Sequence, residues 1–232
     1  MLTFTVVVPA AGVGSRMGAS CPKQYLPLAG KFLIEHTLER LLAHPRIERV
    51  VVPIASDDGF FPTLPVASHP RLLTTIGGGE RADSVLNGLQ LVDSEWVLVH
   101  DAARPCITHQ DIDRLIHLGL SGDGAILGSQ VRDTMKRSDA AGFIQKTVDR
   151  EQLWHALTPQ FFRTALLRAA IEQGLRQGLP ITDEASAMEL AGWHPRMVEG
   201  RADNIKVTRP EALSLAELFL QQQSARQQAR PD

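Results

Sequence analysis

Short apolar runs without polar alternation recur along this chain, and segments with helical periodicity separate them. The runs are rich in β-branched residues, as is typical of strands buried on both faces of a sheet; they cover residues 4–8, 50–54, 72–76, 96–99 and 125–127. Between the runs, apolar side chains recur every three or four residues, for example within 33–42. This order predicts an α/β fold: a mostly parallel, twisted sheet flanked by helices, with its ligand site at the carboxyl ends of the strands.

The alternation fails in residues 129–152, where charged side chains crowd a stretch with little apolar content. We expect this charged arm to leave the body of a single domain that spans residues 1–232. Two interpretations stay open: a solvated β-hairpin, or an arm that swaps onto a partner subunit. After the arm we expect helices at 160–173 and 186–191, then a terminal helix from 210 to about 222 whose glutamine-rich tail frays.

The composition is that of a globular protein with no general nucleic-acid or membrane surface. With 44% hydrophobic and 22% charged side chains, 232 residues can bury a sizeable core. The net charge of −2 provides no bulk attraction to polyanions. Cys21 and Cys106 lie far apart in sequence, and the first apolar run breaks at Pro9, far short of the roughly 20 residues that cross a bilayer. We therefore expect a complete cytoplasmic protein with reduced thiols and with neither nucleic acid nor a membrane as partner.

The loop after the first strand is the candidate anion site. The first 34 residues contain no Asp or Glu, but they carry three cations, and the loop reads Pro9-Ala10-Ala11-Gly12-Val13-Gly14-Ser15-Arg16-Met17-Gly18. Its glycines and alanines let backbone N–H groups approach a ligand without obstruction. The guanidinium of Arg16 and the ammonium of Lys23 are suited to neutralise charge on a triphosphate.

Other interpretations of this loop stay open. It can be a plain glycine-rich connection, with Arg16 and Lys23 as solvated surface cations. It can also bind a dinucleotide, with Asp57 or Asp58 after the second strand contacting a ribose. The spacing departs from that signature, because the glycines fall as G-x-G-x-x-x-G and the loop continues through two prolines instead of entering a helix at once. The P-loop pattern G-x-x-x-x-G-K-[ST] does not occur.

Asp101 is the candidate metal ligand. It follows directly on the predicted strand 96–99, so its side chain is expected at the same sheet edge as the glycine-rich loop. Magnesium usually takes one or two carboxylates together with substrate phosphates, and Asp203 is our choice for the second. Alternatively, Asp101 caps a turn or helix and Asp203 forms an Asx-turn, and Lys206 beside it shares this ambiguity. The histidines and cysteines form no zinc pattern, and no serine or cysteine is marked as a nucleophile.

Eight short motifs follow one another along nearly the whole chain. They read Ala10-Ala11-Gly12-Val13-Gly14-Ser15-Arg16-Met17, Cys21-Pro22-Lys23-Gln24-Tyr25, Gly78-Gly79-Glu80-Arg81-Ala82-Asp83-Ser84-Val85, Asp101-Ala102-Ala103-Arg104-Pro105, Arg132-Asp133-Thr134-Met135-Lys136, Thr158-Pro159-Gln160, Thr182-Asp183-Glu184-Ala185 and Asp203-Asn204-Ile205-Lys206-Val207-Thr208. The first alone marks nucleotidyltransferases in general. The set resembles the 2-C-methyl-D-erythritol 4-phosphate cytidylyltransferases.

The resemblance implies an α/β nucleotidyltransferase of the nucleotide-diphospho-sugar transferase type, with a protruding β-arm. Such an enzyme joins CTP to 2-C-methyl-D-erythritol 4-phosphate with Mg²⁺ and releases pyrophosphate, in non-mevalonate isoprenoid biosynthesis. The resemblance also implies a homodimer, in which the arm crosses to the second subunit and Thr134 and Arg150 complete the partner's site. The chain length leaves no room for the cyclodiphosphate synthase domain that some relatives carry.

Individual roles follow from the same resemblance. Arg16 and Lys23 would stabilise charge on the triphosphate, Arg150 and Lys206 would hold the acceptor phosphate, and Asp101 would bind Mg²⁺. The residues that resemble nucleotide contacts are Ala10, Ala11, Gly12, Gly14, Gly78, Gly79, Ser84 and Ala102. Those that resemble acceptor contacts are Arg104, Thr134 and Thr182, with Asp203 near the metal or the acceptor. Without the resemblance, Gly78 and Gly79 equally suit a plain turn, and Ser84 a helix N-cap.

Three alternative functions stay open from the sequence. The first is nucleotidyl transfer to another acceptor, either cytidylyl transfer to a polyol phosphate such as ribitol 5-phosphate or transfer to a sugar 1-phosphate. The second is an NAD(P)-dependent oxidoreductase that uses the glycine-rich loop. The third is a nucleotide-binding regulator without catalytic activity.

Overall fold

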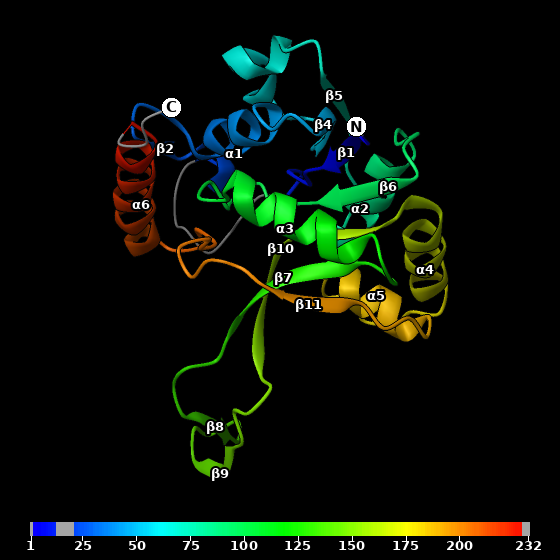
Figure 1. Cartoon of the computed structure of the whole chain (residues 1–232), viewed down its shortest axis with the longest axis vertical. Coiled ribbons are helices and arrows are strands. Elements are labelled where there is room, and N and C mark those ends of the chain that lie inside the picture. The colour runs from blue at the N-terminus through cyan, green and yellow to red at the C-terminus, as the bar shows by residue number, and fades with distance from the viewer. Residues whose placement is uncertain (1, 13–20, 229–232) are drawn as a thin grey trace.

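A computed structural model describes residues 2–12 and 21–228 of the chain. The described residues form a seven-stranded sheet in the order β11-β7-β10-β6-β1-β4-β5 (Figure 1). Its strands are β1 (Phe4–Val7), β4 (Ile47–Ile54), β5 (Leu72–Ile76), β6 (Trp96–Val99), β7 (Ala125–Gln130), β10 (Trp154–Arg163) and β11 (Arg196–Glu199). Neighbouring strands pair in parallel except around β10, which is antiparallel to β6 and β7. The predicted mostly parallel α/β sheet is therefore confirmed.

Helices cover both faces of the sheet. The apolar sides of α1 (Leu33–Leu42) and α3 (His109–Gly119) pack in one core with Phe4 and Val6. The helices α2 (Arg81–Leu89), α4 (Thr164–Arg176) and α5 (Glu184–Leu190) pack on the opposite face with Val7 and Val51. Successive residues of β1 thus point into different cores, which is why its whole apolar run is buried without alternation.

The sequence assignment was wrong for residues 160–163, which were expected to begin a helix. They complete β10, and α4 begins only at Thr164. Phe161 and Phe162 are fully buried, the first in the core under α1 and α3 and the second in the core under α2 and α4. Two adjacent aromatic side chains that fill opposite cores require an extended backbone, because neighbouring side chains alternate across a strand.

The terminal helix α6 (Pro210–Gln228) is longer than expected. Its inner side packs Ala216 and Leu220 against Leu33 and Cys106 in a third, smaller core. Beyond residue 222 the buried amide of Gln223 still donates to the Cys106 carbonyl at 2.9 Å. This anchored turn explains why the helix continues through residues that were expected to fray.

Short elements complete the body of the protein. A 3-10 turn, η2 (Lys23–Tyr25), precedes a small hairpin of β2 (Pro27–Leu28) and β3 (Lys31–Phe32). Two further 3-10 turns, η3 (Phe61–Thr63) and η4 (Pro65–Ser68), connect β4 to β5. Among the described helices, none has the length and apolar character needed to cross a membrane.

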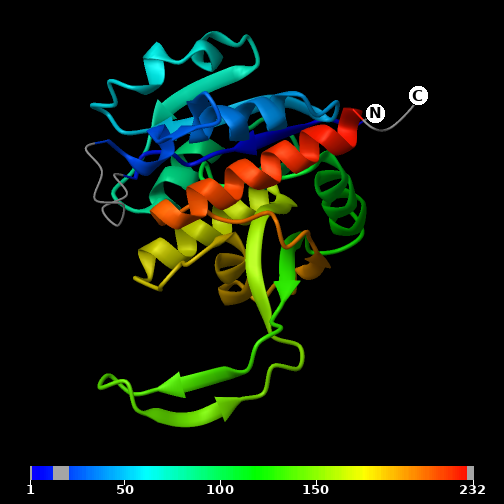
Figure 2. The ribbon, with the colours of Figure 1, turned by 90° about the vertical axis from the view of Figure 1, so that its left-hand side faces the viewer.

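The charged arm contains the antiparallel hairpin of β8 (Met135–Ser138) and β9 (Ile144–Val148). The hairpin extends well away from the sheet in both views (Figures 1 and 2). Every side chain of β8 is exposed, and so are the apolar side chains of Phe143 and Ile144, at 73% and 67%. An isolated two-stranded ribbon has no core of its own, so a partner surface would stabilise it.

His44, which is fully buried just after α1, gives the stability of the protein a pH dependence. Its Nδ1 accepts a hydrogen bond from the Arg46 N–H at 3.2 Å, and its Nε2 lies 3.3 Å from the Asp113 carboxylate. The His44 ring packs edge-on against the ring of His109. Burial lowers the pKa of His44 and outweighs the opposing effect of Asp113. Below the usual histidine pKa of about 6.5, the unfolded chain therefore takes up a proton that the folded protein resists, and the free energy of unfolding falls.

We expect His44→Asn to flatten this part of the pH profile. Asparagine can still accept the hydrogen bond from the Arg46 N–H in an Asx-turn, but it does not titrate. Denaturant unfolding of both proteins between about pH 8 and pH 5 measures the difference, and the stability advantage of the natural protein should shrink as the pH falls. A difference that is constant with pH would contradict the assignment.

Candidate active site

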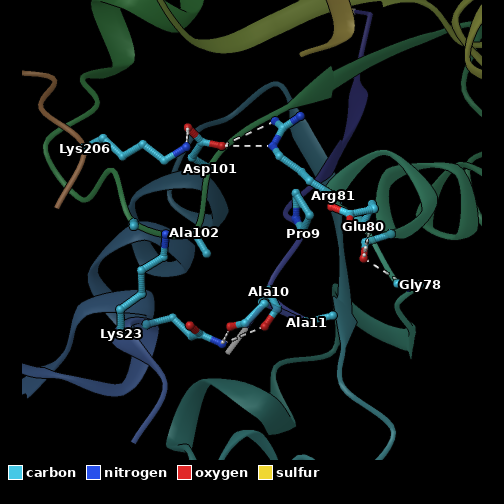
Figure 3. Close-up of a pocket in the computed structure, with 15 residues that line it drawn as sticks. Pro9, Ala10, Ala11, Lys23, Gly78, Glu80, Arg81, Asp101, Ala102 and Lys206 are labelled. Atoms are coloured by element: carbon cyan, nitrogen blue, oxygen red, sulfur yellow. Dashed lines mark hydrogen bonds and ion pairs between the residues drawn. The ribbon is translucent and has the colours of Figure 1, made fainter. Parts of the chain in front are cut away.

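A cavity of about 240 Å³ opens at the carboxyl ends of β1, β5 and β6. Residues 9–12 follow β1, residues 78–81 follow β5 and begin α2, and residues 101–103 follow β6; Lys23 and Gln24 of η2 and Lys206 complete the lining. The location agrees with the ligand site expected for such a sheet. The close-up places Ala10 and Ala11 at one end, Lys23 and Ala102 along one side and Arg81 and Glu80 along the other (Figure 3).

The turn after β5 requires glycine for steric reasons. A Cβ on Gly77 would lie 2.3 Å from the Ala11 Cβ and 2.9 Å from the Ser84 hydroxyl, and a Cβ on Gly78 would lie 2.2 Å from the Asp83 Cβ. The hydroxyl of Ser84 accepts a hydrogen bond from the Gly78 N–H at 3.0 Å. Ser84 is therefore a brace for the turn from within α2 and not an N-cap. The sequence analysis did not single out Gly77, although it brings the turn against Ala11.

Three cations surround the carboxylate of Asp101. Its Oδ1 lies 3.3 Å from the Arg81 guanidinium and its Oδ2 lies 3.0 Å from Lys206 Nζ (Figure 3). The same Oδ2 lies 3.1 Å from Arg104 Nε. Burial alone would raise the pKa of this carboxyl group. The charges of Arg81, Lys206 and Arg104 outweigh burial and hold the pKa well below its usual range. Asp101 is therefore ionised, with both oxygens already engaged.

Arg81 joins Asp101 to a second buried carboxylate. Its Nη1 and Nη2 donate to the two oxygens of Glu184 at 2.6 and 3.1 Å, and Glu184 is 1% exposed at the start of α5. Burial would lower the pKa of Arg81, but Glu184 and Asp101 together raise it above its usual value. The sequence analysis gave neither Arg81 nor Glu184 a role. They stand 103 residues apart, so no local spacing indicates that they pair.

The backbone that carries Asp101 is held by a neutral histidine. Burial lowers the pKa of His100 to about 4. Its Nδ1 lies 3.0 Å from the Thr158 hydroxyl, which also accepts from the Asp101 N–H, and its Nε2 lies 3.1 Å from the Arg104 carbonyl. In a neutral ring, Nδ1 can accept from the hydroxyl while Nε2–H donates to the carbonyl. Thr158 and His100 thus fix the backbone on both sides of Asp101.

A second cavity, of about 280 Å³, adjoins the first. The two share Arg81, Asp101 and Lys206 as a common wall. The remaining lining of the second cavity is Arg104, Ala156, Leu157, Thr158, Gln160, Thr182 and Asp183. Gln160 ties β10 to α5, because its amide donates to Asp183 and accepts from the Ala185 N–H.

Comparison with known proteins identifies the family of the chain that contains these two cavities. The family model described as 2-C-methyl-D-erythritol 4-phosphate cytidylyltransferase, IspD, matches residues 4–222. The chain belongs to this family. The family and enzyme class predicted from the motifs are therefore confirmed.

Curated relatives carry the same family name over almost their whole length. The protein of that name from Aeromonas hydrophila is 68% identical over 99% of this chain and 94% of its own. The one from Tolumonas auensis is 63% identical over 96% of this chain and 99% of its own. A crystal structure of IspD from Francisella tularensis has a TM-score of 0.82 and 33% identity, covering 94% of this chain and 99% of its own. The IspD fold is thus shared along the entire body of the chain.

Most residues predicted from the IspD resemblance meet at the two cavities. Those that line the first are Ala10, Ala11, Gly12, Lys23, Gly78, Gly79, Ser84, Asp101, Ala102 and Lys206. Arg104 and Thr182 line the second. Arg16 and Gly14 lie outside the described residues, so their roles stay predictions.

The remaining predicted IspD residues lie elsewhere. Thr134 is exposed on the arm, and Arg150 lies at its base, where its guanidinium donates to the Arg132 carbonyl. Asp203 pairs with Arg201 and does not line either cavity. The structure thus does not place Asp203 beside Asp101 in a shared metal site. Within residues 2–12 and 21–228, no three His, Cys, Asp or Glu side chains are arranged to hold a metal ion.

The dinucleotide alternative loses its ribose ligand. Asp58 accepts a hydrogen bond from the Tyr25 hydroxyl and from the backbone N–H groups of Phe60 and Phe61, and neither Asp57 nor Asp58 lines the first cavity. Asp58 therefore has a structural role at the start of η3.

Proposed function

We propose that the first cavity binds CTP, that the second binds 2-C-methyl-D-erythritol 4-phosphate, and that the cytidylyl group passes between them with release of pyrophosphate. This is the reaction of the family to which the chain belongs. Its product is 4-diphosphocytidyl-2-C-methyl-D-erythritol, an intermediate of isoprenoid biosynthesis. The assignment of one substrate to each cavity rests on one observation: Arg81, Asp101 and Lys206 form a common wall between the two cavities.

The common wall is suited to the chemistry. An oxygen of the acceptor phosphate attacks the α-phosphorus of CTP, a new P–O bond forms, and the bond to the β-phosphate oxygen breaks so that pyrophosphate leaves. A phosphate monoester dianion is already a nucleophile, so no general base is required. The chain then has to align two anions and neutralise their charge. Lys206 and Arg81 line both cavities and can therefore contact both substrates, whereas Lys23 lines only the nucleotide cavity.

Asp101 is the candidate protein ligand for magnesium in the first cavity, where the ion would compete with Arg81 for Oδ1. Asp101 is ionised and lines the cavity, and a magnesium ion can take its other ligands from phosphates and water. We infer that Asp101 would hold the ion, which when bound would neutralise charge on the triphosphate. Asp203 instead faces Arg201 and Gln223, so we assign it a place behind the site, holding the segment that leads to Lys206.

The position of the arm supports a homodimer. Thr134 and Arg150 lie away from the two cavities of their own subunit, and Arg150 borders a separate hollow at the base of the arm with Gln130 and Trp154. The exposed Phe143 and Ile144 on the hairpin suit burial against a second copy of the chain. We propose that each arm reaches the acceptor cavity of its partner.

Arg150→Ala is expected to raise the KM for the acceptor by about tenfold or more while the KM for CTP changes little, because a charged hydrogen bond to the acceptor phosphate is lost. Steady-state kinetics with each substrate varied in turn measures the split. An increase confined to the KM for CTP would show that Arg150 contacts CTP and not the acceptor. A protein that is strictly monomeric by light scattering and still fully active would exclude the crossed arm.

The decisive test of function is pyrophosphate release. The purified protein is incubated with Mg²⁺, each nucleoside triphosphate and each acceptor in turn, including ribitol 5-phosphate and a sugar 1-phosphate. We expect pyrophosphate release only from the combination of CTP and methylerythritol phosphate. CTP binding without release would indicate a regulator, and protection against thermal unfolding by NAD(P)H but not by CTP would indicate the oxidoreductase.

We expect the enzyme to act in the cytoplasm, where the free thiols of Cys21 and Cys106 are stable.

A further inference from the structure

The amide of Gln24 bridges two parts of the nucleotide cavity. The side chain is buried, at 3% exposed, and its Nε2 donates to the Ala10 carbonyl at 2.7 Å and to the Gly12 carbonyl at 3.2 Å. An amide nitrogen carries two hydrogens, so these two bonds account for both. Gln24 thereby fastens the chain that enters the glycine-rich loop to η2, the turn that carries Lys23.

The turn η2 is itself firmly anchored. Tyr25 is buried, its ring stacks on Phe60 with 5.1 Å between centroids, and its hydroxyl donates to Asp58. The Tyr25 N–H also donates to the Pro22 carbonyl at 2.9 Å. The position of Gln24 is therefore fixed from the loop after β4, independently of the glycine-rich loop that it holds.

The other end of the bridge is anchored on the sheet. The Ala10 N–H donates to the Pro53 carbonyl at 2.8 Å and the Val8 N–H to the Val51 carbonyl at 2.8 Å, which continues the pairing of β1 with β4. At Gly12 an added Cβ would meet no described atom within 4 Å, so no described side chain packs against this position. The carbonyl of Gly12 accepts its hydrogen bond from the Gln24 side chain.

We propose that Gln24 is a positioning residue of the nucleotide site: it holds the segment from Ala10 to Gly12 and Lys23 at a fixed separation, so that both meet one triphosphate. The inference rests on the proposed function, because it assumes that this cavity takes CTP. Gln24 acts through the two parts that it joins. Its loss therefore weakens nucleotide binding without touching the acceptor cavity, whose lining does not include it.

Gln24→Met tests the proposal, because methionine has a similar length and no donor. We expect the KM for CTP to rise about tenfold or more and the KM for methylerythritol phosphate to change less than about threefold, since the buried carbonyl of Ala10 and the more exposed carbonyl of Gly12 lose their donor. Gln24→Glu should be more severe for CTP, because an ionised carboxylate would face two carbonyl oxygens and the triphosphate. Equilibrium binding of CTP to both variants should weaken in the same order.

A matched control separates positioning from general stability. The buried hydroxyl of Thr164 also donates to a backbone carbonyl, that of Ser94 at 2.7 Å, and it lines neither cavity. Thr164→Val should lower the melting temperature and leave the KM for CTP unchanged. An unchanged KM for CTP in Gln24→Met, or an equal rise in both KM values, would overturn the proposal. Failure of the natural protein to release pyrophosphate in the same assay would instead reject the proposed function.

Discussion

Replacing Lys23 with alanine is expected to lower the turnover number by about 10²-fold or more, as the loss of one preorganised charge donor does in other enzymes. Lys23 follows the acid-free loop, lines the first cavity and extends along its side toward Ala102 (Figure 3). In that position its ammonium can offset the charge that develops as pyrophosphate leaves. Single-turnover kinetics at saturating CTP measures the chemical step.

Lys31→Ala provides the matched control. Lys31 belongs to the same acid-free segment, but it is exposed, pairs with Glu39 and lines neither cavity. Its loss should leave turnover within a factor of about two, as expected for a surface ion pair. Near-normal turnover in Lys23→Ala would end the role assigned to this residue, and equal losses in both variants would show that net charge alone matters. Arg16→Ala is expected to match Lys23→Ala.

Arg81→Met is expected to lower the free energy of unfolding by about 3 kcal/mol, because removing one partner of a buried ion pair leaves the other charge uncompensated. The charge left behind is that of Glu184, whose side chain is 2% exposed. Asp101 also loses one of its three cationic partners. Urea unfolding with and without the substitution measures the loss, and turnover should fall in the same variant.

Two comparisons sharpen this prediction. In Arg81→Met/Glu184→Leu the unpaired carboxylate is gone, so much of the stability should return while turnover stays low. Arg49→Met breaks an exposed pair with Asp93 and should have a much smaller effect on unfolding. If the double variant is less stable than Arg81→Met alone, the buried charge of Glu184 is not the cause of the loss.

The sequence predicted the central strands well because their residues are apolar on both faces. Runs such as 50–54 and 96–99 have no polar alternation, and that pattern requires helices on both sides of a sheet. The same local logic failed at residues 160–163. Phe161 and Phe162 suit a helix as well as a strand, and the two opposite cores that they fill are properties of the folded protein.

Much of the candidate site was also predictable from the sequence. Asp101 directly follows a predicted strand, and the carboxyl ends of parallel strands meet at one edge of the sheet. Lys23 and Lys206 lie within motifs that resemble those of the family. Asp203 shows the limit of this reasoning. Its distance from Lys206 along the chain is short, but its carboxylate turns to Arg201 and not to the cavity.

The sequence by itself determined the layers of the fold, the family and the edge of the sheet where the site lies, because hydrophobic periodicity and motif order are written in consecutive residues. Only the tertiary structure decided which charges compensate one another. Arg81 reaches Glu184 across 103 residues, and Gln24 reaches back to the carbonyls of Ala10 and Gly12. Such partners depend on how the chain packs, since a charge or amide is satisfied by whichever group the fold brings within about 3 Å of it.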